Sequence, residues 1–166
     1  MRRSWKAVTL AAAILLLMGT VGAVSIASAA PQTAEHPKTQ VLHFIGHQTS
    51  LELIDLGKQG NSPGDQAVET ETLLQHGTRI GRDVLSCVAI TVGAQGIDAL
   101  CHGALILRGG QIQFQGETTF DAPFTVAVTG GTGRYQNVGG QLTVERTLPN
   151  GIDDVETLRL VFFETE

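Results

Sequence analysis

The stretch Ala127–Val144, AVTGGTGRYQNVGGQLTV, decides the fold: an alternating, strand-like run breaks into a glycine-rich turn and re-enters a second strand-like run. Gly130, Gly131 and Gly133 permit the positive φ angles and the close approach that a tight chain reversal needs. No Lys-Ser or Lys-Thr pair follows these glycines, and no helical run follows for a phosphate to cap. The stretch therefore predicts two strands joined by a turn, not a nucleotide-binding loop.

The rest of the chain repeats this pattern from residue 41 onward, with short apolar or alternating runs separated by Gly, Asn, Asp and Pro. No convincing run of helical period interrupts them, which is typical of an all-β protein. The pattern predicts eight strands, with a lead-in extension at 41–46; they lie near 51–56, 67–74, 83–92, 97–107, 111–117, 124–129, 141–146 and 157–163. Eight strands with short turns favour a closed antiparallel, calycin-like β-barrel, because closure removes exposed strand edges.

Two features of such a barrel stay open at this point. The interior of an eight-stranded barrel can be filled by side chains or can hold one small ligand, and strand pattern does not distinguish these cases. The predicted strands at 83–92, 97–107 and 157–163 carry apolar residues on both faces. We expect the outer apolar face to be buried in a homo-oligomer, a dimer or a trimer.

The N-terminus has the features of a secretory signal peptide. Arg2, Arg3 and Lys6 precede an uncharged apolar run that ends in the small residues Ala27-Ser28-Ala29-Ala30. We predict a signal peptide at 1–29, a flexible leader at 30–40 and one barrel domain at 41–166, hence a secreted or extracytoplasmic protein. If the signal were not cleaved, the apolar run could anchor the chain in a membrane.

The charge of the predicted mature chain excludes one class of partner. The signal segment holds three of the eleven Lys and Arg residues and none of the sixteen Asp and Glu residues. Eight basic residues against sixteen acidic ones leave a formal charge of −8. A chain this acidic is not expected to bind the nucleic-acid backbone.

Cys87 and Cys101 lie on consecutive predicted strands at nearly equal distances from the turn at 93–96. They should face each other, and in an exported protein such a pair most often forms a disulfide. A thiolate nucleophile is the alternative, but His102 cannot serve as its base from the adjacent position, because neighbouring strand residues point to opposite faces.

A metal site is not expected. His43 and His47 share one face of an extended strand, but His76 and His102 lie in a turn and on a distant strand. This spread is more typical of surface and packing residues than of zinc ligands. The sequence also points to no cofactor.

The acidic residues of the second predicted strand are the strongest chemical signal. Glu69 and Glu71 share one face with Leu73, while the other face carries Val68, Thr70, Thr72 and Leu74. If the Glu face lines the lumen, two carboxyl groups meet in an apolar cavity, where a raised pKa is expected. Glu52 is a second candidate of this kind. The alternative is that all three side chains point to solvent.

Four blocks of sequence together resemble the allene oxide cyclase and dirigent barrel superfamily. They are GDQAVETETLL at 64–74, GTRIGRDVLSCVAIT at 77–91, GGQIQFQG at 109–116, and the opening stretch at 127–144. Their order and spacing match, and the resemblance covers about residues 51–163. Bacterial proteins with this barrel include cyclases that fold linear polyketides, among them enzymes that form spirotetronates by cycloaddition.

The resemblance implies an apolar lumen that holds an unsaturated substrate in one reactive conformation. Residues that line the pocket in the plant cyclases align with Glu52, Glu71 and Cys87, with Leu53 as the neighbouring alternative to Glu52. We therefore predict Glu71 and Glu52 as catalytic residues. The predicted substrate-binding residues are Glu69, Leu73, Cys87, Ala89 and Phe114.

The resulting hypothesis is an exported barrel that binds a lipid-like or polyketide-like molecule and promotes its cyclisation or isomerisation. A non-catalytic, dirigent-like or carrier protein with the same lumen is the competing hypothesis. A structural domain with a side-chain-filled barrel is the third.

Overall fold

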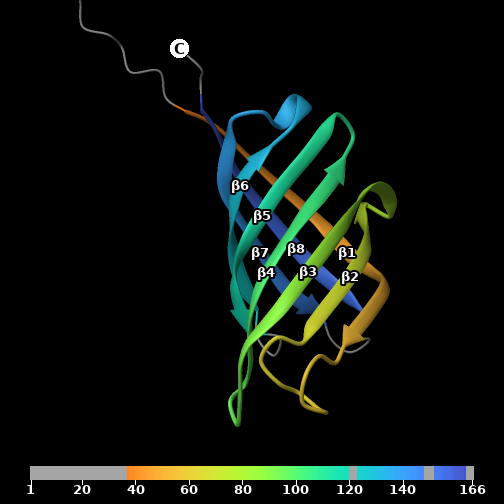
Figure 1. Ribbon diagram of the computed structural model, residues 1–166. Coiled ribbons are helices and arrows are strands. Elements are labelled where there is room, and N and C mark those ends of the chain that lie inside the picture. The colour runs from red at the N-terminus through yellow and green to blue at the C-terminus, as the bar shows by residue number, and fades with distance from the viewer. Residues whose placement is uncertain (1–36, 120–122, 148–151, 164–166) are drawn as a thin grey trace, which may run out of the picture. The chain divides into compact units, whose positions relative to one another are not determined.

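A computed structural model describes residues 37–119, 123–147 and 152–163 of the 166-residue chain. Eight antiparallel strands follow one another around a closed barrel, and β1 pairs with both β2 and β8 (Figure 1). The strands are β1 Lys38–Ile54, β2 Gln66–Gln75, β3 Thr78–Gly93, β4 Gly96–Leu107, β5 Gly110–Thr119, β6 Phe124–Gly131, β7 Val138–Thr147 and β8 Asp153–Phe162. The predicted all-β, eight-stranded closed barrel is confirmed.

β1 differs from its prediction in length. The lead-in at 41–46 and the first predicted strand are one continuous strand that begins at Lys38, three residues inside the predicted leader. The register with β2 shifts between Gln48 and Ser50, so Thr49 is an extra residue that forms a β-bulge. The predicted signal peptide and the leader up to residue 36 lie outside the described residues, as do the turn residues 121–122 and 149–151.

The opening glycine stretch forms the end of β6, a short 3₁₀ helix η1 Gly133–Tyr135, and β7. Gly133 has a φ of 61°, which suits a residue without a Cβ. Tyr135 is buried beneath this turn and belongs to the main hydrophobic cluster. The predicted turn between two strands is confirmed.

Large apolar side chains fill the part of the barrel next to η1. The cluster is formed by Phe44, Leu73, Leu105, Ile112, Phe114, Val126, Val128, Tyr135, Val138, Leu142, Leu158 and Leu160. Figure 1 shows η1 at one end of the barrel and the loop between β1 and β2 at the other. The end of the barrel at the β1–β2 loop is therefore the end that these large side chains leave less filled. No helix in the described ranges is long and apolar enough to span a membrane.

Candidate functional site

The inner face of β2 carries Ala67, Glu69, Glu71 and Leu73, and its outer face carries the exposed Val68. Alternation along the strand and the burial of Ala67, Glu71 and Leu73 fix this orientation. Glu69 is partly buried and Glu71 only 9% exposed. Of the two faces that the sequence left open, the glutamate face lines the lumen.

Three carboxyl groups from three strands meet in the barrel interior. Glu71 of β2 lies directly opposite Asp83 of β3 in the strand register, and Glu156 reaches them from β8. One carboxyl oxygen of each residue lies within 4.8 Å of the corresponding oxygen of the others. We call Glu71, Asp83 and Glu156 the carboxyl cluster.

Gly46 of β1 makes room for this cluster. β1 lies between β2 and β8 and pairs with both, so the Glu71 and Glu156 side chains must pass over it to meet. A Cβ on Gly46 would overlap Oε2 of Glu71 and would come within 2.5 Å of Oε1 of Glu156. The glycine thus leaves the volume that the two carboxyl groups occupy.

Burial controls the acidity of the cluster. It raises the pKa of Asp83 well above its usual range, and the negative charge of Glu71 raises it further. The pKa of Glu156 is also raised, first by burial and then by the charges of Asp83 and Glu71. A side-chain hydrogen bond between Glu156 and Glu71 adds to this effect, because it forms only while one group holds a proton.

The same conclusion follows from hydrogen bonding. If the three groups were all carboxylates, neither oxygen of Glu156 and not Oδ1 of Asp83 would receive a hydrogen bond. Glu156 is only 1% exposed, so bulk water does not supply the missing donors. Buried anionic oxygens without donors are costly, and a proton or a positively charged partner removes the cost. Asp83 and Glu156 therefore hold protons up to a higher pH than isolated carboxyl groups do.

Two neighbouring spaces lie beside the cluster. The inner cavity, about 30 Å³, is lined by Glu69 and the whole cluster and has room for about one water molecule. The mouth pocket, about 450 Å³, lies between the start of β2, the end of β3 and the loop at 55–65. Glu69 and Cys87 line both spaces, so a ligand in the mouth pocket would contact two residues that also border the inner cavity.

The loop that borders the mouth pocket is held by Asp65. Its carboxylate accepts hydrogen bonds from the backbone N–H groups of Leu56 (2.8 Å) and Ser62 (2.7 Å), which lower its pKa. The backbone of Asp65 accepts a hydrogen bond from Ala89 N–H on β3 (2.8 Å). One residue thus shapes the loop internally and ties it to the barrel wall.

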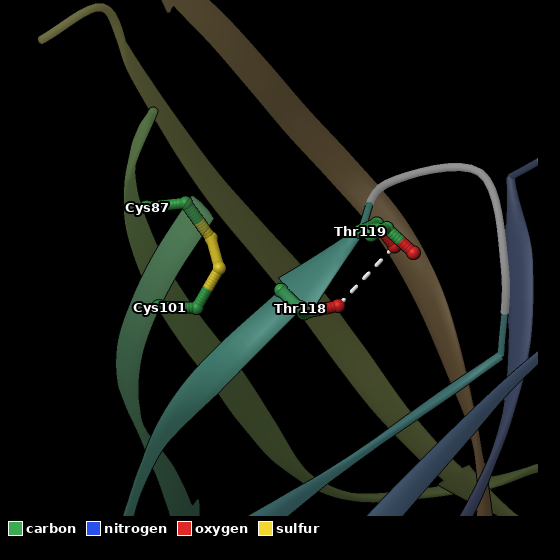
Figure 2. Close-up of a disulfide and its surroundings, with 4 residues drawn as sticks. All are labelled: Cys87, Cys101, Thr118 and Thr119. Carbon is green, nitrogen blue, oxygen red and sulfur yellow. Dashed lines mark hydrogen bonds between the residues drawn. A yellow bond between two sulfur atoms is a disulfide. The ribbon is translucent and has the colours of Figure 1, made fainter. Parts of the chain in front are cut away.

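The predicted disulfide is present. Cys87 on β3 and Cys101 on β4 face each other in the register, with Cα atoms 4.1 Å apart, and both are 1% exposed. Figure 2 shows the bridge beside Thr118 of β5, whose hydroxyl donates to the Thr119 carbonyl. Both sulfur-bearing residues line the inner cavity, so the disulfide is part of the site wall.

The expected position of Glu52 in the lumen is wrong. Before the bulge the even-numbered residues Phe44 and Gly46 point inward, but the extra residue Thr49 shifts the alternation by one. Glu52 is exposed and pairs with the outward-facing Val68, whereas Leu51 and Leu53 line the mouth pocket. Leu53, the neighbouring alternative in the alignment, takes the inward position.

The other predicted binding residues separate into two groups. Glu69, Cys87, Ala89 and Phe114 line one or both of the spaces described above. Leu73 is fully buried in the apolar cluster and borders neither space. Its expected contact with substrate is therefore corrected to a packing role.

The histidines do not gather into a site among the described residues. His43 bonds to the Thr157 hydroxyl, and His47 lies 2.7 Å from Asp153 of β8. Within those residues the group able to offer three ligand atoms to a metal ion is the carboxyl cluster itself.

Sequence reasoning missed Asp83 and Glu156, although a signal was present. Asp83 alternates with Leu85, Cys87 and Ala89 along β3, and Cys87 and Ala89 were already predicted to line the lumen. Glu156 alternates with the buried Leu158 and Leu160. A carboxyl residue in phase with an apolar inner face was the recognisable pattern.

Comparison with known proteins gives matches among solved structures alone. No family model and no curated protein matches the chain. A pyocyanin demethylase is 29% identical, with a TM-score of 0.67, over 73% of this chain and 99% of its own length. The Diels–Alderase AbmU from Streptomyces koyangensis is 17% identical, with a TM-score of 0.62, over 75% of this chain and 64% of its own.

A pterocarpan synthase dirigent protein is 13% identical, with a TM-score of 0.60, over 79% of this chain and 99% of its own length. At these low identities the cyclase and the dirigent protein are evidence for the fold. The predicted resemblance is confirmed at the level of the fold: this chain has the barrel fold of these Diels–Alderase and dirigent structures.

Proposed function

We propose that this protein is an enzyme of the isomerase or cyclase type that acts on an unsaturated small molecule by proton transfer. The observation that carries the proposal is the carboxyl cluster. Three buried carboxyl groups within 4.8 Å of one another adjoin the mouth pocket of about 450 Å³ through Glu69 and Cys87. Strongly perturbed carboxyl groups beside a pocket are typical of acid–base catalysis.

The cluster can both give and take a proton. A protonated carboxyl group donates to a heteroatom of the ligand, such as a carbonyl oxygen or a ring nitrogen. A neighbouring carboxylate accepts a proton from a carbon next to the resulting unsaturated system, and a double bond shifts between the two positions. The ligand has gained and lost one proton, so the reaction is an isomerisation, and ring closure can follow from the shifted double bonds.

Each residue has a distinct part in this scheme. Glu71 is the source of the proton, which reaches the ligand through Glu69, the glutamate that borders both spaces; Asp83 and Glu156 hold the second proton. Gln48 donates a hydrogen bond to Glu69 and fixes its carboxylate. General acid–base catalysis of this kind contributes about 10²- to 10⁴-fold in rate.

The apolar half of the barrel limits the substrate. Because side chains fill the region next to η1, a long chain cannot extend through the lumen, and the ligand must fit the mouth pocket. A volume of about 450 Å³ lies within the range of small-molecule sites. The likeness to pyocyanin demethylase supports a compact ring system rather than an extended polyketide or lipid.

A dirigent-like or carrier protein is the second candidate, and the shared fold with a dirigent protein supports it. In that case the carboxyl groups would orient the ligand by hydrogen bonds and would not exchange protons with it. Binding would be the same for both candidates, so only turnover distinguishes them.

The experiment follows proton exchange in D₂O. Cyclic enones and N-heteroaromatic compounds, pyocyanin among them, are incubated with the protein, and deuterium incorporation and products are measured by mass spectrometry. We expect exchange by the unmodified protein and a loss of about 10²- to 10³-fold in Glu71→Gln. Glu52→Gln, on the outer face, is the matched control and should retain full activity.

Two outcomes would count against the enzyme. Ligands that bind without exchange or products favour the carrier, and the absence of binding across the set favours a structural barrel. Native mass spectrometry of the purified protein separates these last two cases.

The same proposal places the protein outside the cytoplasm and in a homo-oligomer. The signal-like segment at 1–29 and a buried disulfide support export. Exposed apolar residues on the outer wall support subunit packing: Val41, Val68, Ile90 and Leu100. Sequencing the N-terminus of the exported protein and analytical ultracentrifugation test the two points.

A further inference from the structure

The two spaces of the site are strongly one-sided in charge. Seven acidic residues line the mouth pocket and the inner cavity: Asp55, Asp65, Glu69, Glu71, Asp83, Asp154 and Glu156. No lysine, arginine or histidine is among the described residues that line either space. A ligand that enters the site therefore meets acidic groups, and no basic ones, from the rim to the floor.

The deepest of these groups are short of hydrogen-bond donors. Apart from the carboxyl-to-carboxyl hydrogen bond with Glu71, Glu156 has no donor to either oxygen and is 1% exposed; Asp83 lacks a donor at Oδ1 and is 6% exposed. Both residues line the inner cavity. Near the rim, in contrast, the Asp65 and Asp55 carboxylates already accept backbone N–H groups, such as Gly60 N–H on Asp55. The unmet requirement for positive charge lies at the floor of the site.

We propose that the ligand of this site is an organic cation, with a flat apolar body in the mouth pocket and its positive centre at Glu69, facing the carboxyl cluster. This inference rests on the proposed function and names the charge class of its substrate. In a site of low dielectric a positive charge close to several carboxylates is strongly favoured, and an anionic ligand is excluded.

The lining of the mouth pocket argues for an organic cation rather than a metal ion. Seven aliphatic side chains line it, together with polar loop residues: Leu51, Leu53, Ile54, Ala67, Ala89, Val92 and Ile97. A hydrated metal ion would leave this apolar surface in contact with water. A hydrophobic ring would bury it, and this burial stabilises the complex. A ring nitrogen that carries a methyl group or a proton combines the two properties.

Cation binding is coupled to proton release. The groups that face the inner cavity are Glu69 and Glu71 from β2, Asp83 from β3, and Asp154 and Glu156 from β8. The other strands present apolar, hydroxyl or disulfide side chains to it, as Phe114, Thr118 and Cys101 do. A bound cation and the protons of the cluster compete for the same negative charge, so affinity for a permanent cation rises with pH.

The test compares three molecules of one skeleton: 10-methylacridinium, neutral acridine and acridine-9-carboxylate. Binding is measured at pH 8 by ligand fluorescence and by isothermal titration calorimetry. We expect the cation to bind at least about tenfold more tightly than acridine, and the carboxylate not to bind. Titrations in two buffers of different ionisation enthalpy should show net proton release with the cation.

Variants assign the effect to named groups. Glu69→Gln and Glu156→Gln should each reduce the preference for the cation over acridine several-fold, and Glu52→Gln on the outer face should leave it unchanged. Equal affinity for the cation and acridine, or binding of the carboxylate, would overturn the inference. So would Mg²⁺, Ca²⁺ or Zn²⁺ that binds the cluster and displaces the dye.

The binding test and the proton-exchange experiment can give negative results independently of each other. If the protein selects cations but exchanges no protons with any ligand, the enzyme proposal is wrong and the charge inference stands. If it isomerises neutral enones and shows no preference for cations, the reverse holds.

Discussion

A methyl group on Gly46 would lie 2.1 Å from Oε2 of Glu71, so a side chain at this position of β1 would displace the Glu71 carboxyl group. The two residues are distant in sequence and lie on neighbouring strands. The relationship links the backbone of β1 to the chemistry of β2 and β8, and it makes a glycine in a regular strand a determinant of the site.

We expect Gly46→Ala to displace the Glu71 and Glu156 carboxyl groups and to abolish proton exchange with bound ligands. Because the crowding falls on two side chains inside a packed barrel, a destabilisation of about 1 to 3 kcal/mol should accompany it, measured by urea unfolding. Gly130→Ala is the matched control: it is also a strand glycine, but a Cβ there meets nothing within 4 Å. Full activity in Gly46→Ala would show that the cluster is not the catalytic site.

The raised pKa values of Asp83 and Glu156 predict that the barrel is more stable in mild acid than at neutral pH. In the unfolded chain these groups lose their protons near the ordinary values of 3.8 and 4.5. The folded barrel keeps them protonated to higher pH, so above those values the native state binds more protons and stability falls as pH rises. Thermal unfolding between pH 5 and pH 8 should show a melting temperature that falls with pH.

Glu156→Gln identifies the source of that dependence. The amide is neutral at every pH, so we expect a flatter pH profile and a higher melting temperature than the unmodified protein at pH 8. A tenfold change in acidity between the folded and unfolded chain corresponds to about 1.4 kcal/mol, or about 4 °C in a domain of this size. An unchanged profile in both Glu156→Gln and Asp83→Asn would contradict the proposed electrostatics.

The fold could be predicted because its evidence is local. Each turn is marked by its own Gly, Asn or Pro residues, and each strand by its own alternation, so the number and order of strands need no long-range information. The facing cysteines could be predicted for the same reason, since one hairpin turn at 93–96 sets their register. The Glu69 and Glu71 pair was likewise visible within a single strand.

The site, in contrast, depends on the register between strands and on the closure of the barrel, which the pattern of a single strand does not show. Residues 47–50 of β1 are polar on both faces, so no break in alternation reveals the bulge at Thr49, and the reversal of Glu52 and Leu53 could not be foreseen. Bringing Glu156 to Glu71 requires the closure of β8 onto β1 and the space above Gly46. Burial of a carboxyl group follows from that three-dimensional register and not from its neighbours in sequence.

The disulfide should contribute substantially to stability. Cys87 and Cys101 are 14 residues apart, and closing a loop of this length stabilises the folded state by about 3 kcal/mol in the chain-entropy estimate. We expect a Cys87→Ala/Cys101→Ala double variant to unfold at lower urea concentration by a corresponding amount. A reducing agent should lower the stability of the unmodified protein and leave the double variant unaffected; equal sensitivity of both would argue against the bridge.

Asp65 should control the mouth pocket without controlling the barrel. Asp65→Ala removes the acceptor for the Leu56 and Ser62 N–H groups but leaves the backbone bond from Ala89 in place. We expect faster hydrogen exchange at 55–62 by mass spectrometry and weaker binding of ligands in the mouth pocket, with exchange in β4 and β5 unchanged. Asp65→Asn retains one acceptor oxygen and should show a smaller effect.

Because the Asp65 carboxylate has a lowered pKa, its contribution to holding the loop is present above the ordinary value of 3.8 and is lost as pH falls through the folded value. Loop exchange in the unmodified protein should therefore approach that of Asp65→Ala only in strong acid, and a loop that is already mobile at neutral pH would contradict this role.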